Sequence, residues 1–185
     1  RQYQVVAGRP GKYKIISRKL SYHGNTLATL SFGDIKQRRA DYLPMLWDTP
    51  HIEPCYCYRC PFGKEYPGCD IDCARALEKK ILEEGPDTVA AFMAEPIVAA
   101  AAGATVPPQE YFPIIRETCD KYNVILIFDE VVTGFGRTGK NMGMDHFGVV
   151  PDVAVFAKGV SSGYAPLAGM AVRDELVGLF EQKGV

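Results

Sequence analysis

The chain has 185 residues, which is enough for one domain with a sizeable buried core. Its formal net charge of −1 excludes the strongly basic surface that a nucleic acid or an anionic membrane would need. The apolar stretch over residues 89–106 is interrupted by Glu95, Pro96 and Gly103, so it does not predict a membrane span.

The first third of the chain predicts one short strand, one short helix and a long irregular segment. Residues 14–17 form an apolar run typical of a strand, and Asn25 or Thr26 is suited to cap a short helix after it. Residues 48–68 are rich in Pro, Cys, Tyr and Gly, which predicts an irregular excursion from the fold.

Two amphipathic helices are expected, over residues 72–84 and 109–122. Asp70 is the expected cap of the first helix, and Gly85 with the proline after it ends that helix. Pro113 is expected to distort the first turns of the second helix. In both segments apolar residues recur at helical spacing: Ala74, Leu77 and Ile81, and then Tyr111, Ile115, Cys119 and Tyr122.

Four further apolar runs predict strands, over residues 89–94, 124–128, 153–156 and 167–172. The runs contain no alternating polar residues, so we expect strands that are buried on both faces. Strands of this kind alternating with helices predict an α/β fold with a mainly parallel sheet flanked by helices.

Three charged residues follow these runs directly: Glu95, Asp129 and Lys158. Any one of them alone is most simply a strand-end charge that reaches solvent. Together they point to a site, because ligands of open α/β sheets bind beyond the carboxyl ends of the strands. A carboxylate and an amine at two strand ends suit pyridoxal phosphate, whose aldehyde reacts with a lysine and whose pyridine nitrogen needs an acid.

Two nucleotide-binding motifs compete for the segment at residues 134–140, GFGRTGK. It matches the P-loop pattern G-x-x-x-x-G-K, but Asn141 stands where a P-loop needs Ser or Thr to bind the metal. The same glycines match G-x-G-x-x-G, yet no strand ends at Gly134 as the dinucleotide motif requires. Both nucleotide interpretations are therefore disfavoured.

Several motifs occur in an order that resembles a known family: YHGNT, AEPI, ILIFDEVVTGFGRTGK, PDV with AKG, and GYAPLAG. Through them nearly the whole chain resembles the class III, fold type I, pyridoxal-phosphate-dependent aminotransferases. The resemblance implies that residues 1–185 are part of the large cofactor-binding domain and that the small domain is not present. Because the first residue is Arg1 and not Met, we expect the domain to be incomplete at both ends.

The resemblance also implies roles for five residues. Lys158 would form the internal aldimine with pyridoxal 5′-phosphate and later move the proton between the substrate and the cofactor. Asp129 would pair with the protonated pyridine nitrogen. Val131 and Tyr22 would pack on the two faces of the ring, and Glu95 would lie beside the pocket. His23 is a weaker candidate, because a purely structural histidine is at least as good an interpretation.

The stretches YHGNTLATLS and AKGVSSGYAPLAG are most similar to the ω-amino acid and amine–pyruvate branch of the family. The resemblance therefore implies transfer of an amino group from an amine or ω-amino acid to a 2-oxo acid such as pyruvate. A racemase, aminomutase or decarboxylase on the same scaffold is the first alternative, and a non-catalytic, truncated interaction domain is the second. Because subunits of the family complete each other's sites, we expect a homodimer or homotetramer, without nucleic acid or membrane partners.

Five of the six cysteines lie between Cys55 and Cys73. Four of them form two closely spaced pairs, Cys57 with Cys60 and Cys69 with Cys73. Four thiols within such a short span could bind zinc. Only eight residues separate the two pairs, so free or packed thiols are favoured and no metal site is expected. Since no signal peptide is visible, we expect reduced thiols in a cytoplasmic protein.

Overall fold

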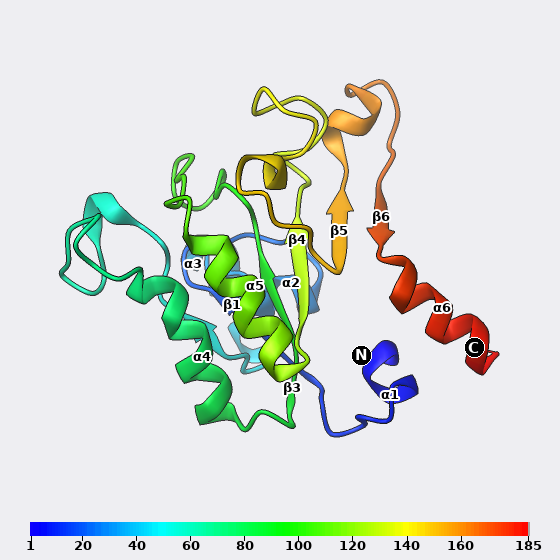
Figure 1. Ribbon diagram of the computed structural model, residues 1–185. Helices are drawn as coiled ribbons and strands as arrows, with labels where there is room; N and C mark the ends of the chain where they lie inside the picture. Colours follow the sequence, from blue (N-terminus) through cyan, green and yellow to red (C-terminus); the bar gives the residue numbers. More distant parts are fainter. Residues whose placement is uncertain (185) are drawn as a thin grey trace.

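A six-stranded sheet organises residues 1–184, the part of the chain that the computed structural model describes (Figure 1). Its strand order is β2-β1-β3-β4-β5-β6; the first five strands run parallel, and β6 pairs antiparallel with β5. The mainly parallel sheet that the sequence predicts is therefore confirmed. The strands are β1 (Lys14–Arg18), β2 (His51–Ile52), β3 (Val89–Ala94), β4 (Ile125–Asp129), β5 (Val153–Phe156) and β6 (Gly169–Val172).

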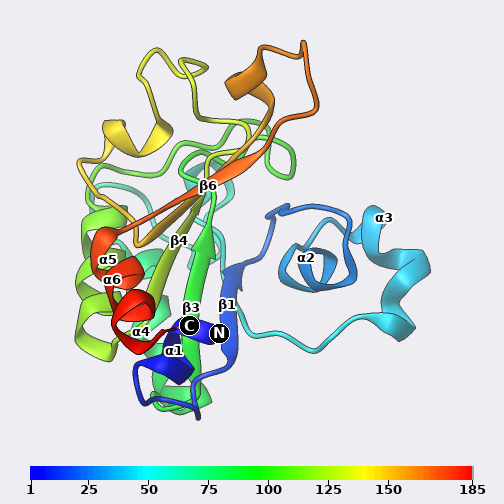
Figure 2. The same ribbon diagram turned by 90° about the vertical axis from the view of Figure 1, so that its right-hand side faces the viewer.

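Helices α4 and α5 lie side by side across one face of the sheet, in front of it in Figure 1, whereas α2 and α3 project beyond β1 (Figure 2). None of the helices in residues 1–184 has the length and apolarity to cross a membrane. The α-helices are α1 (Gln2–Val6), α2 (Leu27–Phe32), α3 (Lys36–Arg39), α4 (Asp72–Glu84), α5 (Tyr111–Tyr122) and α6 (Asp174–Lys183). Short 3-10 turns are η1 (Ala40–Met45), η2 (Cys57–Arg59), η3 (Gly143–His146) and η4 (Lys158–Ser161).

The helix starts agree with the sequence only in part. Thr26 caps α2 as expected, because its Oγ1 accepts a hydrogen bond from the Thr29 N–H at 3.2 Å. The predicted cap of α4 is wrong: Ile71 holds the N-cap position without a side-chain hydrogen bond. Asp70 and Ile71 both have left-handed backbone (φ 48° and 51°), and this turn removes the Asp70 side chain from the cap position. Pro113 is the third residue of α5, where its missing N–H has no intrahelical acceptor, and the helix continues through it.

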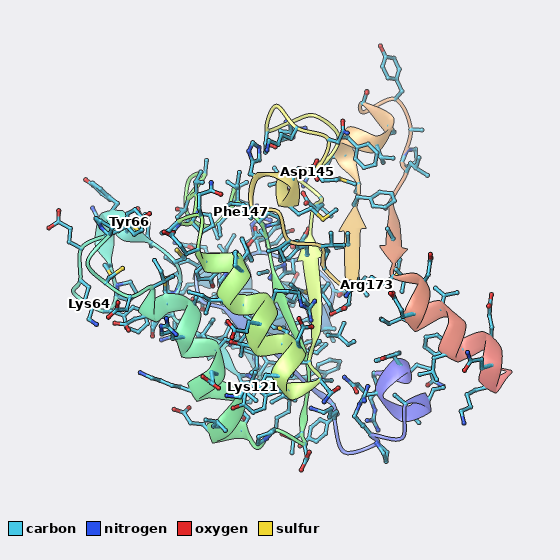
Figure 3. The ribbon with its side chains drawn as sticks, viewed as in Figure 1. Lys64, Tyr66, Lys121, Asp145, Phe147 and Arg173 are labelled. Atoms are coloured by element: carbon cyan, nitrogen blue, oxygen red, sulfur yellow. The ribbon has the colours of Figure 1, made fainter. Side chains whose placement is uncertain are left out.

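The main core fills the space between the sheet and the helices α4 and α5. Phe112 of α5 is its centre, with ring centroids 4.7 Å from Phe128 of β4 and 5.0 Å from Phe147. Figure 3 shows Phe147 beside the upper end of α5. Truncating a buried phenylalanine of this kind lowers the free energy of unfolding by about 3–5 kcal/mol. The cluster therefore helps to fix the position of β4 relative to α5.

The opposite face of the sheet is less covered. Ile125 and Ile127 are only half-buried and line a hollow of about 280 Å³ together with Phe180 of α6. The predicted burial on both faces is therefore wrong for β4 within residues 1–184. The apolar strand β6 is likewise exposed, with Met170 67% accessible. Helices α1 and α6 contact each other, and residues of both helices line this hollow (Figure 1).

Candidate active site

The ends of three neighbouring strands come together at one edge of the sheet, where the loops after β4 and β5 rise together (Figure 1). Phe128 pairs in register with Ala94 of β3 and Ala154 of β5, so the exits of the three strands are level. Glu95 follows β3, Asp129 is the last residue of β4, and Lys158 lies two residues after β5. All three side chains line a single cavity of about 390 Å³. The structure also brings Tyr22, His23 and Val131 to this cavity, and so unites all the candidates that the sequence indicates.

Asp129 is held by two hydrogen bonds and is only 6% exposed. Its Oδ2 lies 2.9 Å from His23 Nδ1, and its Oδ1 accepts the Val131 N–H at 3.1 Å. An ionised carboxylate only accepts hydrogen bonds, so His23 Nδ1 carries the proton of this contact. Each carboxylate oxygen keeps acceptor capacity, and Asp129 can therefore bind one further donor from the cavity.

Glu95 is a second acidic residue of the cavity, and it differs from Asp129 in its hydrogen bonding. It is 5% exposed, and its Oε2 has no hydrogen-bond partner among the described residues. Burial raises the pKa of Glu95 to about 7; His23 and Arg18 oppose this rise and Asp129 adds to it. Its backbone is fixed by Arg18, whose Nη2 donates to the Glu95 carbonyl oxygen at 2.5 Å. Near neutral pH Glu95 is therefore present in both protonation states.

Tyr22 contributes an aromatic wall to the cavity. Its hydroxyl donates to Asn25 Oδ1 at 2.9 Å, and the guanidinium carbon of Arg38 lies 4.2 Å from its ring centroid. This cation–π contact places a positive charge on the cavity wall. The sequence does not single out Arg38, because it belongs to the short helix α3, whose four residues, KQRR, carry no recognisable motif.

Lys158 occupies a strained position at the start of η4. Its φ of 46° is left-handed, which costs roughly 1–3 kcal/mol for a residue other than glycine. Gly159 follows it, and a Cβ there would lie 3.0 Å from Phe135 Cβ and 3.1 Å from the Gly134 carbonyl oxygen. The lysine–glycine pair therefore lets the loop after β4 pack closely against the turn that presents Lys158 to the cavity.

The carboxylate of Glu130 holds the loop after β4 in place. It is fully buried, and its carboxylate accepts the N–H groups of Gly143 at 2.9 Å and Met144 at 2.8 Å, as well as the Thr133 hydroxyl. Asp129, the last residue of β4, lines the cavity, whereas Glu130, the first residue after the strand, fixes the loop. The sequence offers only the pair of acids as a signal, and that pair does not reveal which acid is structural.

The chain is also similar to known proteins. The family model of class-III aminotransferases matches residues 1–184. The chain is 42% identical over its full length to the putrescine–pyruvate aminotransferase of Pseudomonas aeruginosa, covering 40% of that protein. It is 44% identical over 85% of its length to the taurine–pyruvate aminotransferase of Bilophila wadsworthia, covering 34% of that protein.

Solved structures show the same fold. An aminotransferase of Bacillus anthracis superposes with a TM-score of 0.91 at 40% identity, over 98% of this chain and 40% of the other. An ω-transaminase of Thermomicrobium roseum gives a TM-score of 0.90 at 40% identity with the same coverage. The chain thus spans about two fifths of the length of these relatives and has the fold of type I transaminases. It belongs to the class-III aminotransferases, a family that depends on pyridoxal 5′-phosphate.

Proposed function

We propose that the intact protein is an aminotransferase that moves an amino group from an amine or ω-amino acid to a 2-oxo acid such as pyruvate. Residues 1–185 would form part of its large cofactor-binding domain, incomplete at both ends, and the small domain would lie outside them. The observation that carries the proposal is the union of Asp129 and Lys158, on neighbouring strand exits, in one cavity. The names of the two pyruvate-dependent relatives support pyruvate as the acceptor.

The cavity fits pyridoxal 5′-phosphate. Its volume of about 390 Å³ lies within the usual range of small-molecule sites. Two buried polar atoms that face no partner in residues 1–184, Glu95 Oε2 and His23 Nε2, belong to side chains of its wall. When bound, the cofactor supplies an electron sink that makes the α-proton of the amine acidic. The residues present supply an amine, a carboxylate and an aromatic face for it.

Each residue then has a defined task. Asp129 would accept a hydrogen bond from the protonated ring nitrogen, while His23 keeps the carboxylate oriented. Tyr22 and Val131 would pack against the ring and exclude water from it. Lys158 would bind the cofactor covalently through Nζ and, once released, carry a proton to and from the substrate α-carbon as a general base and acid.

Arg38 supports ω-amino acids as donors. Its guanidinium lies on the cavity wall over Tyr22, and among residues 1–184 it forms no ion pair with a carboxylate. An arginine in this setting binds carboxylate or sulfonate groups well, because its planar fork donates two parallel hydrogen bonds. We therefore assign it to the anionic end of the donor.

We further propose a homodimer or homotetramer in the cytoplasm. Support for assembly comes from large apolar side chains exposed along and just after η1: Tyr42, Leu43, Met45 and Trp47. Support for a reducing compartment comes from the cysteines, since all six are free thiols in residues 1–184.

The test is a direct assay of the full-length protein with pyridoxal phosphate, β-alanine and pyruvate, which measures the formation of α-alanine with pyruvate and without it. The holoenzyme is also reduced with borohydride, and the pyridoxyl group is located by peptide mapping. We expect alanine to form, the label to map to Lys158, and Lys158→Ala to abolish turnover. Lys140→Ala is the matched control, because Lys140 is exposed and does not line the cavity.

Different products would support the alternatives. Racemisation of a chiral amino acid or release of carbon dioxide from an amino acid would identify a racemase or a decarboxylase, and conversion of β-alanine to α-alanine without pyruvate would identify an aminomutase. A protein that stays colourless with added cofactor would favour a non-catalytic domain. Neither alternative is favoured by the relatives, which are named as aminotransferases.

A further inference from the structure

Arg18 is a buried cation that lies behind the wall of the 390 Å³ cavity. It is the last residue of β1, the strand beside β3 in the sheet, and only 1% of it is exposed. Its guanidinium carbon lies 5.7 and 5.9 Å from the ring centroids of Tyr111 and Phe112. Within residues 1–184 Arg18 forms no ion pair with a carboxylate, and its Nε has no hydrogen-bond partner. A buried charge of this kind is costly unless a nearby group offsets it.

Arg18 connects two chain segments that form the wall of the cavity. Its Nη2 donates a hydrogen bond to the Glu95 carbonyl oxygen at 2.5 Å, directly after β3. Its own carbonyl oxygen accepts a hydrogen bond from the hydroxyl of Ser21 at 2.6 Å. Ser21 is fully buried and precedes Tyr22 and His23, which line the cavity together with Glu95. Arg18 therefore holds the two segments together from behind the wall.

The carboxyl group of Glu95 also responds to the charge of Arg18. Its Oε2 has no hydrogen-bond partner among the described residues. Burial raises the pKa of Glu95 to about 7, and Arg18 opposes this rise. The charged and titratable groups around Glu95, in and behind the cavity, are Arg18, Tyr22, His23, Arg38, Asp129 and Lys158. Of these side chains, only that of Arg18 is hydrogen-bonded to Glu95 within residues 1–184.

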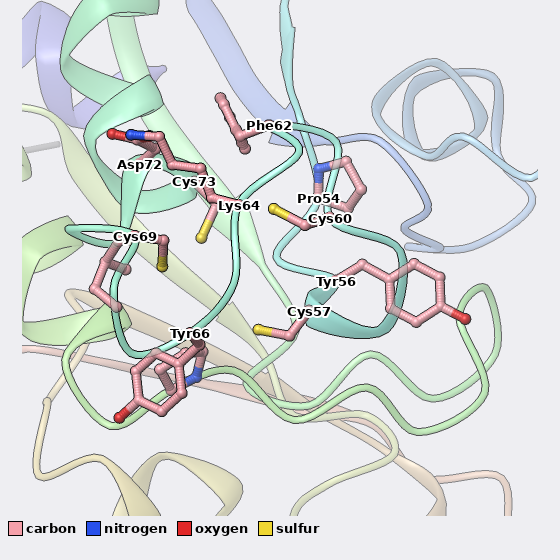
Figure 4. Close-up of a pocket in the computed structure, with 12 residues that line it drawn as sticks. Pro54, Tyr56, Cys57, Cys60, Phe62, Lys64, Tyr66, Cys69, Asp72 and Cys73 are labelled. Atoms are coloured by element: carbon pink, nitrogen blue, oxygen red, sulfur yellow. The ribbon is translucent and has the colours of Figure 1, made fainter.

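The thiol of Cys73 is the rival counter-charge for Arg18. Cys55 and, more weakly, Arg18 lower the pKa of the Cys73 thiol. Within residues 1–184, however, no hydrogen bond joins Cys73 to Arg18, and Cys73 lines a separate, much smaller cavity of about 20 Å³ (Figure 4). Direct contact with Arg18 thus distinguishes Glu95 from Cys73, and a substitution of Cys73 can separate the two in an experiment.

We propose that Arg18 is a positioning residue of the active site. It fixes the Glu95 segment and the Tyr22–His23 segment of the wall relative to each other, and its charge stabilises the ionised Glu95 carboxylate. Loss of a positive charge beside a buried carboxyl group favours the protonated form of that group. The part that Arg18 plays in the reaction rests on the proposed aminotransferase activity, because Glu95 lines the same cavity as Lys158.

Infrared titration of the full-length protein in its apo form measures the ionisation of Glu95 directly. The carboxylic-acid band of Glu95 is the band that Glu95→Gln removes. We expect its midpoint at about pH 7 in the wild type and at least about one pH unit higher in Arg18→Met, which keeps the apolar stem but not the charge. Arg18→Lys keeps the charge, so its midpoint should stay within about half a pH unit of wild type.

Two controls and one activity measurement complete the experiment. Arg75 is exposed on α4, so Arg75→Met should leave the Glu95 midpoint unchanged, and Cys73→Ala should do the same. The holoenzymes are then assayed for the formation of α-alanine from β-alanine and pyruvate over the same pH range. The pH profile of kcat should shift upward in Arg18→Met with the Glu95 midpoint and keep its wild-type position in Arg18→Lys. A residue needed only for folding would lower activity without moving this profile.

An identical Glu95 midpoint in Arg18→Met and the wild type would overturn the proposal, and so would a midpoint that moves in Cys73→Ala. A kcat profile that stays fixed while the infrared midpoint moves would refute the part of Arg18 in the reaction. Absence of α-alanine with the wild type would contradict the proposed function, whereas the infrared result would still decide whether Arg18 stabilises the carboxylate. If Arg18→Met does not fold, Arg18→Gln also removes the charge. A wild-type Glu95 band that persists above about pH 9 would overturn the proposal without any variant of Arg18.

Discussion

The apo form of the full-length wild-type protein should lose stability as Glu95 ionises with rising pH, and Glu95→Gln should abolish this loss. Glu95 is 5% exposed, and burial raises its pKa from the ordinary value of 4.5 to about 7. A rise of this size corresponds to about 3 kcal/mol, at about 1.4 kcal/mol for each pKa unit. Glutamine has nearly the same shape and stays neutral, so the variant avoids the cost of a buried charge.

The direction of the effect follows from proton linkage. The folded protein holds the Glu95 proton more tightly than the unfolded chain does. This contribution to stability is fully present below pH 4.5 and is lost as the pH rises through about 7. The free energy of unfolding of Glu95→Gln, relative to wild type, should therefore increase by about 2–3 kcal/mol between about pH 5 and about pH 8.5.

Urea unfolding of the apo proteins at these two pH values measures the difference. Glu117→Gln is the control, because Glu117 is exposed on α5 and its replacement should leave the pH dependence of wild type unchanged. If wild type and Glu95→Gln lose stability in parallel as the pH rises, Glu95 does not carry the raised pKa. The account of the cavity as a site with two unlike acids would then be refuted.

Three further outcomes are expected. Asp129→Asn should fold but lose the charge beside the ring nitrogen, and kcat should fall at least about a hundredfold, as expected for loss of about 3 kcal/mol from a buried ionic partner; near-normal turnover would contradict its role. Arg38→Met should raise KM for β-alanine about tenfold, with little change for an amine that has no carboxylate or sulfonate group. Lys36 is an exposed neighbour outside the cavity, so Lys36→Met should change neither KM. Light scattering at micromolar concentration should show a dimer or larger assembly burying well over ~2,000 Å², and a fully active monomer would argue against shared sites.

Five of the six strands in residues 1–184 could be predicted because each contains a short apolar run bounded by turn residues, whereas β2 lies inside residues 48–68, which the sequence predicts as irregular. Apolar runs fix where a strand lies, but they do not reveal what covers it. The half-buried Ile125 and Ile127 and the exposed Met170 show this limit, since the coverage of a sheet face depends on other segments. The direction of β6 is also a property of the pairing with β5, which the composition of residues 167–172 does not encode.

Some residues of the candidate site could likewise be predicted from the sequence, and others could not. Residues that directly follow strands could be placed at one edge from sequence, because parallel strands end together. The contact of His23 with Asp129 spans 106 residues of sequence, and no local pattern predicts it. Arg38 reaches the cavity only because α3 folds back beside Tyr22, so its position follows from tertiary structure. The false prediction of Asp70 as a cap has a local cause, the left-handed turn that precedes α4.

The order of the strands explains why one cavity can serve both ends of an aromatic cofactor. β3, β4 and β5 are neighbours in the sheet as well as consecutive in sequence, so their exits form a row with spacings of about 4.8 Å. Asp129 ends the middle strand, and Lys158, which is itself left-handed, follows the next strand after the extended residue Ala157. The ring nitrogen and the aldehyde of pyridoxal phosphate lie on opposite sides of the ring, so an acid and an amine from the same strand exit could not reach both. Adjacent exits can, and the strained backbone at Lys158 turns its side chain toward the cavity that Asp129 already lines.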